Sequence, residues 1–142
     1  MQLLPSFYPK SMNINTNNNK IFKNFLLVDD DPDDREIFIE VVGRLNYEIS
    51  VKEVDSAETA VKDLLIKEEL PDVIFLDINM PLMSGWDFLK IIKTHPKVRE
   101  VPIVMYSTSS SELDFKMAKR LGADWYLVKP SNMEKLKAAV QW

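Results

Sequence analysis

Residues 73–77, Val73-Ile74-Phe75-Leu76-Asp77, place a carboxylate directly after a run of four apolar residues. A short apolar run of this kind, bounded by turn residues, predicts a strand that is buried on both faces. Two other runs are followed by charged residues in the same way: Phe25–Val28 by Asp29 and Asp30, and Trp125–Val128 by Lys129. The sequence therefore predicts that three acids and one base follow the ends of three buried strands.

The predicted strands alternate with helical patterns along the chain. The strands are Phe25–Asp29, Ile49–Val54, Val73–Leu76, Ile103–Tyr106 and Trp125–Val128, and a helical pattern follows each of them. Such alternation predicts an α/β fold in which a parallel sheet carries helices on both faces. Functional sites in these folds lie beyond the carboxyl ends of the strands. We therefore expect the charged residues and Ser107 to meet there, with the less apolar second strand at the side of the sheet.

Capping residues mark the starts of most predicted helices. The candidates are Asp31 before Pro32, Ser56, Ser109 in a capping box with Glu112, and Ser131 in a capping box with Glu134. The fourth helix is expected to end at Leu121-Gly122, since glycine readily adopts the left-handed conformation that ends many helices. Asp33 and Asp34 lie in the first turn of the first helix, where the helix dipole favours anions. We interpret these two acids and Asp31 as helix-start residues rather than ligands.

The composition excludes several kinds of site. The chain has 142 residues, enough for one domain with a substantial core, and it has no cysteine and one histidine. Disulfides, thiolate catalysis and a metal cluster of several histidines are therefore ruled out within the chain. The net charge of −4 gives no reason to expect nucleic-acid binding, and no apolar run approaches the roughly 20 residues of a membrane span. Without a secretory signal pattern, we expect a cytoplasmic protein.

The first 22 residues differ in composition from the rest. Five of the seven residues from 13 to 19 are asparagine, so this stretch cannot bury much apolar surface. We predict a flexible polar tail over residues 1–22 and one domain over residues 23–142, with no residues left for a second domain. Met12 is an alternative natural start of the protein.

The charges at the predicted edge of the sheet suggest a metal site. Asp29, Asp30 and Asp77 together carry −3, and like charges a few ångströms apart oppose ionisation. A divalent cation and Lys129 supply +3 and would neutralise the set. Oxygen ligands without sulfur favour a hard ion, with Mg2+ preferred.

This arrangement suits the transfer of a phosphoryl group to a carboxylate. Asp77 would attack phosphorus and form an acyl phosphate, while Mg2+ offsets the negative charge that separates two anions. Lys129 would bind a phosphoryl oxygen as a mobile point charge. Ser107 offers a hydroxyl donor. The backbone carbonyl of Asn79 is a candidate metal ligand, because it lies two residues beyond the nucleophile.

Four segments resemble the receiver domain of bacterial two-component response regulators. They are Leu27–Asp31, Asp77–Gly85, Tyr106–Thr108 and Val128–Pro130, in that order along the chain. The resemblance covers roughly residues 23–142. It implies a flavodoxin-like (βα)5 fold, which is a doubly wound parallel five-stranded sheet with strand order 2-1-3-4-5.

The resemblance also implies a role for each site residue. Asp77 matches the phosphoacceptor and Lys129 the phosphate-binding lysine. Among the metal ligands, Asp30 matches the direct magnesium ligand, Asp29 its neighbour that acts through water, and Asn79 the ligand through its backbone carbonyl. Ser107 matches the switch hydroxyl, Tyr126 the switch aromatic, and Pro130 a cis-proline candidate. Two features depart from the family pattern: Ser131 occupies a position that is usually bulky and apolar, and the final helix is short. The short helix weakens the case for dimerisation through that face.

The function implied by the resemblance is that of a single-domain response regulator, which catalyses only its own phosphorylation and dephosphorylation. A sensor histidine kinase or a histidine phosphotransfer protein would donate the phosphoryl group to Asp77. A conformational change would then signal to a separate downstream protein or along a phosphorelay. Neither nucleic acid nor a membrane is expected as a partner.

Three other interpretations have weaker support. A receiver fold that ignores phosphate would act as a scaffold, although the acidic pair and Lys129 argue against it. A phosphatase of the haloacid dehalogenase type needs a general acid two residues after the nucleophile, where this chain has Asn79. A calcium loop over residues 29–40 would have Asp34 where the turn needs glycine.

Overall fold

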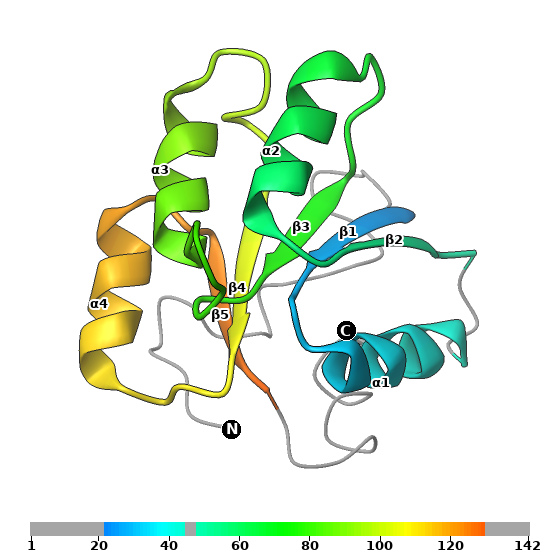
Figure 1. Cartoon of the computed structure of the whole chain (residues 1–142), viewed down its shortest axis with the longest axis horizontal. Coiled ribbons are helices and arrows are strands. Elements are labelled where there is room, and N and C mark those ends of the chain that lie inside the picture. Colours follow the sequence, from blue (N-terminus) through cyan, green and yellow to red (C-terminus); the bar gives the residue numbers. More distant parts are fainter. Residues whose placement is uncertain (1–21, 45–47, 130–142) are drawn as a thin grey trace.

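Strands and helices alternate along the part of the chain that the structure describes. A computed structural model describes residues 22–44 and 48–129. The elements, labelled in Figure 1, are β1 (Asn24–Val28), α1 (Pro32–Gly43), β2 (Ser50–Val54), α2 (Ala57–Ile66), β3 (Val73–Leu76), α3 (Gly85–Thr94), β4 (Ile103–Ser107), α4 (Glu112–Arg120) and β5 (Trp125–Val128). Each predicted strand is present, with ends within one residue of the prediction. The predicted last helix, Pro130 and residues 1–21 of the predicted tail lie outside the described residues.

The strands form one parallel sheet in the order β2-β1-β3-β4-β5. This order confirms the predicted flavodoxin-like α/β fold. As predicted, β2 lies at the edge, and most of its residues are exposed or half-buried. Over the described ranges, no helix is both long enough and apolar enough to cross a membrane.

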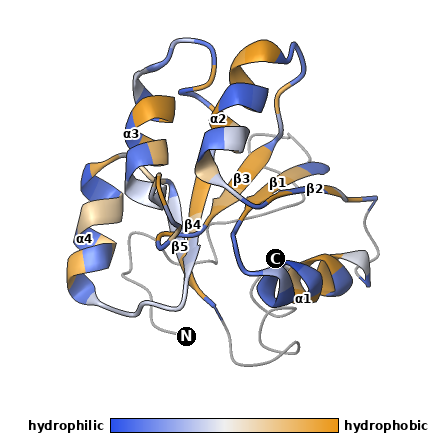
Figure 2. Cartoon of the chain, viewed as in Figure 1, coloured by the Kyte–Doolittle hydropathy of each residue, from blue (hydrophilic) through white to orange (hydrophobic). Residues whose placement is uncertain are grey.

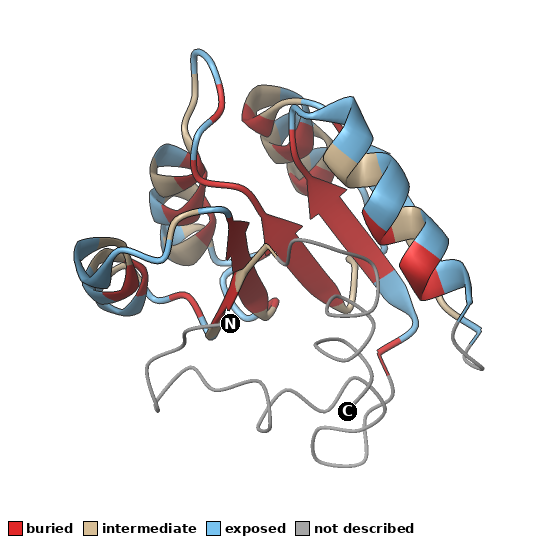
Figure 3. Ribbon diagram, turned by 90° about the horizontal axis from the view of Figure 1, so that it is seen from below, coloured by how far each residue is buried: buried red, intermediate tan, exposed pale blue. Residues whose placement is uncertain are grey.

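The helices cover both faces of the sheet. α1 lies on one face, and α2, α3 and α4 lie on the other (Figure 1). Successive residues of a strand point to opposite faces, so each inner strand contributes to two cores. In β3, Val73 and Phe75 pack under α1, whereas Ile74 and Leu76 pack under the other three helices. The inner strands are therefore apolar (Figure 2) and buried (Figure 3) along nearly their whole length.

Aromatic rings pack together in the core under α1. The ring centroid of Phe38, on α1, lies 4.9 Å from that of Phe75 and 5.5 Å from that of Tyr106. Phe25 extends the cluster, with its centroid 5.3 Å from that of Phe75. All these side chains are buried. Because aromatic side chains bury large apolar areas, the cluster fixes α1 against the sheet and thereby positions the start of α1 beside the end of β1.

Two predicted helix starts and one predicted helix end are confirmed. Asp31 caps α1 by accepting hydrogen bonds from two backbone N–H groups of the first turn, and Pro32 occupies the first helical position. The Ser56 hydroxyl caps α2 by accepting a hydrogen bond from the Thr59 N–H. Gly122 follows α4 with a φ of 95°, the left-handed conformation that glycine adopts without strain.

The predicted capping box at the start of α4 is wrong. Ser111, not Ser109, is the N-cap, and its hydroxyl accepts a hydrogen bond from the backbone N–H of Asp114. Glu112 becomes the first helical residue instead of the third. The Ser109 hydroxyl donates to the Asp114 carboxylate. Ser109, Ser110 and Ser111 are adjacent hydroxyl residues of similar capping ability, and the cap in use is the one that places the acid Asp114 at the third helical position.

Gly85 allows the loop after β3 to pack directly on the start of α3. Its N–H donates to the carbonyl oxygen of Ile78 at 2.8 Å. A Cβ atom at this position would overlap the backbone carbonyl of Asp77 and would lie 2.9 Å from the Cα of Ile78. The backbone that carries Asp77 is therefore held by a contact that only glycine permits.

Replacing Gly85 by alanine should lower the free energy of unfolding by about 2 kcal/mol or more, because backbone atoms must move to admit the methyl group. Gly43→Ala is the matched control, since a Cβ there would meet no atom from another part of the described chain within 4 Å. Alanine is also the better helix former, so the control should be neutral or stabilised by up to about 1 kcal/mol. Urea denaturation measures both variants. Equal stability of the two variants would show that the close contact at Gly85 is not required.

Candidate functional site

The predicted site residues come together at the carboxyl edge of the sheet. The last residues of β1 and β3 are register partners, so Asp29 and Asp77, which follow them, lie beside each other. β4 ends at Ser107, whose register partner is the last residue of β5. Lys129 follows that residue, and its backbone N–H donates to the Ser107 carbonyl oxygen at 2.7 Å. The parallel topology thus brings together the ends of four strands.

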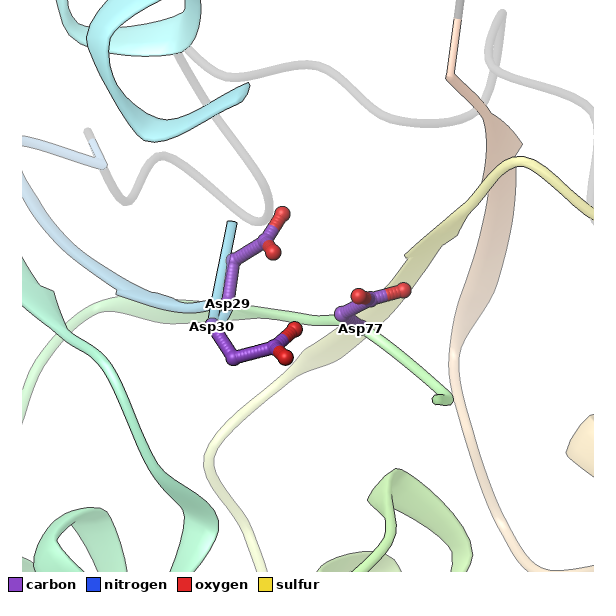
Figure 4. Close-up of side chains that lie close together, drawn as sticks. All are labelled: Asp29, Asp30 and Asp77. Atoms are coloured by element: carbon purple, nitrogen blue, oxygen red, sulfur yellow. The ribbon is translucent and has the colours of Figure 1, made fainter. Parts of the chain in front are cut away.

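Three carboxylates form a cluster that could hold a cation. One oxygen from each of Asp29, Asp30 and Asp77 lies within 4.8 Å of the others. Figure 4 shows these side chains close together, with the Asp30 carboxylate directed toward Asp77. Asp29 and Asp77 are buried. Carboxylates this close together oppose one another's ionisation, and a bound divalent cation would offset their charge.

The Lys129 ammonium provides the positive charge of the site. Its Nζ lies 2.7 Å from Oδ2 of Asp29, 2.9 Å from Oδ2 of Asp34 and 3.5 Å from Oδ2 of Asp77, and its side chain is only 7% exposed. The ring centroid of Tyr106 lies 5.5 Å from Nζ. Burial by itself lowers the pKa of Lys129, but the carboxylates of Asp29 and Asp34 outweigh burial and leave that pKa raised. Lys129 therefore stays charged at neutral pH.

Asp34 is a residue of this site that the sequence interpretation missed. It was assigned to the helix start, but its carboxylate turns toward Lys129 and accepts a hydrogen bond from Nζ at 2.9 Å. Asp31 and Asp33 stay exposed at the helix start, in agreement with the interpretation. The available signal was spacing: Asp34 lies one turn before the buried Phe38, so the two side chains share the face of α1 that meets the sheet.

Ser107 and Tyr126 are connected through the backbone of Ser109. Ser107 is buried, and its hydroxyl oxygen accepts a hydrogen bond from the Ser109 N–H at 3.2 Å. The Tyr126 side chain is also buried, and its O–H donates to the Ser109 carbonyl oxygen at 2.9 Å. The Tyr126 ring packs edge-on against Phe115 of α4, with 4.6 Å between the centroids. A single residue thus links the site to the surroundings of α4.

An open cavity of about 310 Å3 lies over the carboxylates. The lining residues are Asp30, Asp31, Asp34, Asp77, Asn79, Thr108 and Lys129. Because the cavity opens to solvent, a hydrated cation and a small anionic group can approach the carboxylates through it. Asn79, the predicted carbonyl ligand, therefore lies at the same opening as the acids.

Burial gives Asp77 unusual acid–base behaviour. The side chain is 10% exposed, and burial raises its pKa from 3.8 to about 6, with Lys129 opposing this rise and Asp29 adding to it. One carboxylate oxygen, Oδ1, accepts a hydrogen bond from the Ile78 N–H at 2.9 Å. The other oxygen, Oδ2, is the one nearest Lys129.

The resemblance carried by the four sequence segments is confirmed by a family model. The model of the response regulator receiver domain matches residues 25–141. The chain belongs to the response regulator receiver family. This family acts in two-component signalling, and aspartate phosphorylation and Mg2+ are general features of it.

Chemotaxis proteins are among the relatives of this receiver. It is 32% identical over 118 residues to a CheY homolog of Campylobacter jejuni, covering 82% of this chain and 88% of that protein. It is 29% identical over 117 residues to the probable chemotaxis protein CheY of Rhizobium etli, with coverage of 82% and 88%. The receiver also matches the transcriptional regulatory protein PhoB of Klebsiella pneumoniae, at 30% identity, but spans only 50% of that protein.

Solved structures of response regulators share the fold of this receiver. The phosphorylated cyanobacterial phytochrome response regulator RcpA is 28% identical, with a TM-score of 0.77 and coverage of 84% of this chain and 89% of that one. The Mn2+-bound form of the response regulator Rcp1 has the same identity and coverage and a TM-score of 0.75. The chemotaxis protein CheY4 of Vibrio cholerae is 30% identical, with a TM-score of 0.71 and coverage of 84% and 97%.

Asp77→Asn should stabilise the metal-free receiver at neutral pH. The pKa of about 6 in the folded state lies above the ordinary value of 3.8, so the folded state holds the Asp77 proton more tightly than the unfolded state does. The stability that depends on this proton is complete below about pH 4 and is lost as the pH rises through 6. At pH 7 the neutral, isosteric amide should therefore raise the free energy of unfolding by roughly 1–3 kcal/mol.

Urea denaturation of wild type and Asp77→Asn at pH 4 and pH 7 tests this prediction. The difference between the two proteins should be large at pH 7 and should shrink toward zero at pH 4. A variant that is less stable than wild type at pH 7 would contradict the assignment of Asp77 as a buried carboxylate that opposes folding.

Proposed function

We propose that this receiver accepts a phosphoryl group on Asp77 in a Mg2+-dependent reaction and signals through the resulting conformational change. The observation that supports this proposal is the surroundings of the Asp77 carboxylate. It lies beside Asp29 and Asp30, with oxygens within 4.8 Å, and its Oδ2 atom lies 3.5 Å from the Lys129 ammonium. A carboxylate between a cation-binding cluster and a buried ammonium is suited to accept an anionic group.

The donor set of the cluster fits Mg2+. Its side chains offer only carboxylate oxygens, and three of these oxygens lie close enough together to surround one ion. Asp30 and Asp77 would bind the ion directly, Asp29 through a water molecule, and Asn79 through its backbone carbonyl. When bound, Mg2+ supplies the positive charge that lets a phosphoryl oxygen approach these carboxylates.

The phosphoryl donor would be a phosphorylated histidine of a sensor kinase or a phosphotransfer protein. Oδ2 of Asp77 attacks phosphorus as the bond from phosphorus to the histidine nitrogen breaks, and that nitrogen keeps the electron pair. Lys129 would then hold a phosphoryl oxygen, because the neighbouring carboxylates keep its side chain charged and close to the reacting atoms. Asn79 cannot act as a general acid beside Asp77, so a phosphatase that turns over free phosphomonoesters is not supported.

Ser107 and Tyr126 would convert the new charge into a change of surface. The Ser107 hydroxyl lies at the end of β4 beside the site, so it can turn from the Ser109 N–H toward a phosphoryl oxygen. Tyr126 shares Ser109 as a partner, and its position would change with that loop. The surface of α4 and β5 then differs between the two states, and a partner protein in the cytoplasm would recognise that difference.

Exposure to acetyl phosphate and Mg2+ should add the mass of one phosphoryl group to the wild-type protein, because a small acyl phosphate can replace the histidine donor. Mass spectrometry under mildly acidic conditions measures the adduct. Asp77→Asn should abolish it, and Asp33→Asn, which removes an exposed carboxylate near the same edge, should retain it. An undiminished adduct in Asp77→Asn would rule out Asp77 as the acceptor.

Asp30→Asn should weaken Mg2+ binding by at least about tenfold, because it removes a direct carboxylate ligand. Asp30 is exposed, so the substitution should leave the fold intact. Calorimetric titration of the unphosphorylated protein with Mg2+ measures the affinity, and Asp33→Asn again serves as the control for the loss of one negative charge. Equal affinities of the two variants would place the cation elsewhere.

A further inference from the structure

We propose that Asp34 competes with the phosphoryl group for Lys129 and thereby destabilises the phosphorylated state. This inference rests on the proposed phosphorylation of Asp77, and it concerns a residue outside the predicted acceptor and metal set. Asp34 acts through Lys129, so it is a positioning residue rather than a catalytic one.

The distances around Lys129 favour Asp34 over the acceptor. Nζ lies 2.9 Å from Oδ2 of Asp34 but 3.5 Å from Oδ2 of Asp77. Nζ also lies 2.7 Å from Oδ2 of Asp29. Asp29 and Asp34 therefore share the Lys129 ammonium at closer range than Asp77 before any phosphoryl group arrives.

The start of α1 holds Asp34 in this position. One turn later, Phe38 is fully buried in the aromatic cluster. The next residue, Arg35, donates from Nη1 to the Asp29 carbonyl oxygen at 2.9 Å and from Nε to Glu53 at 2.9 Å. These contacts fix the backbone on which the Asp34 side chain stands, so its carboxylate stays near Lys129 when the site is loaded.

The charge of the site becomes unbalanced once Asp34 is included. Asp29, Asp30, Asp34 and Asp77 carry −4, whereas Lys129 and a divalent cation carry +3. A phosphoryl group brings further negative charge and must bind the same ammonium as Asp34. In a partly buried site, repulsion between anions that share one cation is only weakly screened. The Asp34 carboxylate therefore disfavours the loaded site relative to the empty one.

The neighbouring Asp33 provides a matched control. It lies in the same first turn of α1, it is exposed, and within the described residues Lys129 forms its ion pairs with other acids. Asp33→Asn and Asp34→Asn remove the same charge and the same favourable interaction with the helix dipole. They differ in the contact with Lys129.

Titration with beryllium fluoride, which mimics a bound phosphoryl group, tests the proposal in the presence of saturating Mg2+. Asp34→Asn should bind beryllium fluoride about fivefold to tenfold more tightly than wild type, and Asp33→Asn should stay within about twofold. Asp34→Ser should bind beryllium fluoride as tightly as Asp34→Asn does, whereas the affinity of Asp34→Glu should be close to that of wild type. NMR titration reports both the affinity and the fold of each variant.

Two further measurements separate this role from a structural one. In Mg2+ titrations without beryllium fluoride, Asp34→Asn should bind no more tightly than Asp33→Asn, so tighter binding is confined to the phosphoryl mimic. The acyl phosphate formed from acetyl phosphate should also persist several-fold longer in Asp34→Asn than in wild type. An unchanged or weaker affinity of Asp34→Asn for beryllium fluoride, or an equal gain in Asp33→Asn, overturns the inference. If wild type itself binds no beryllium fluoride, the proposed function fails instead.

Discussion

The ion pairs of the buried Lys129 ammonium are the interaction on which the candidate site depends. A parallel sheet ends its strands at one edge, so acids that follow β1 and β3 are forced into proximity. Without a cation nearby, each of these carboxylates opposes the ionisation of the others. Lys129, which follows the last strand of the described chain, places one ammonium among these acids, and its side chain is 7% exposed. β5 is an outer strand beside β4, and the long Lys129 side chain reaches from its end to the acids that follow β3 and β1.

The site is built from the sheet and from one helix together. The strand ends provide Asp29, Asp77 and Lys129, and α1 provides Asp34. The packing of α1 therefore influences chemistry that takes place at the ends of strands. The aromatic cluster around Phe38 stabilises the fold and also sets the rotation of α1 about its own axis, which decides which carboxylate of the first turn reaches the ammonium. Core packing and charge placement are thus coupled in this receiver.

The sequence predicts those parts of the structure that depend on local pattern and topology. Continuous apolar runs identified β1, β3, β4 and β5, and parallel topology alone was enough to bring Asp29 and Asp77 to one edge. The cap of α4 was mispredicted because adjacent serines have nearly equal capping ability, and the loop from β4 selects Ser111. Asp34 was missed because its direction depends on how a whole helix is rotated against the sheet. The packing of Phe38 determines that rotation, and a pattern of charges does not encode it.

The hydrogen bonds of Ser109 bear on how this receiver can diverge in sequence. Both of its bonds to Ser107 and Tyr126 use main-chain atoms, the amide on one side and the carbonyl on the other. In the proposed switch, motion of the Ser107 hydroxyl would therefore pass through two consecutive peptide planes and not through the Ser109 side chain. The Ser109 hydroxyl instead donates to the Asp114 carboxylate and accepts a hydrogen bond from the Ser111 N–H. Replacing Ser109 would therefore disturb the start of α4 and leave both main-chain bonds to Ser107 and Tyr126 available.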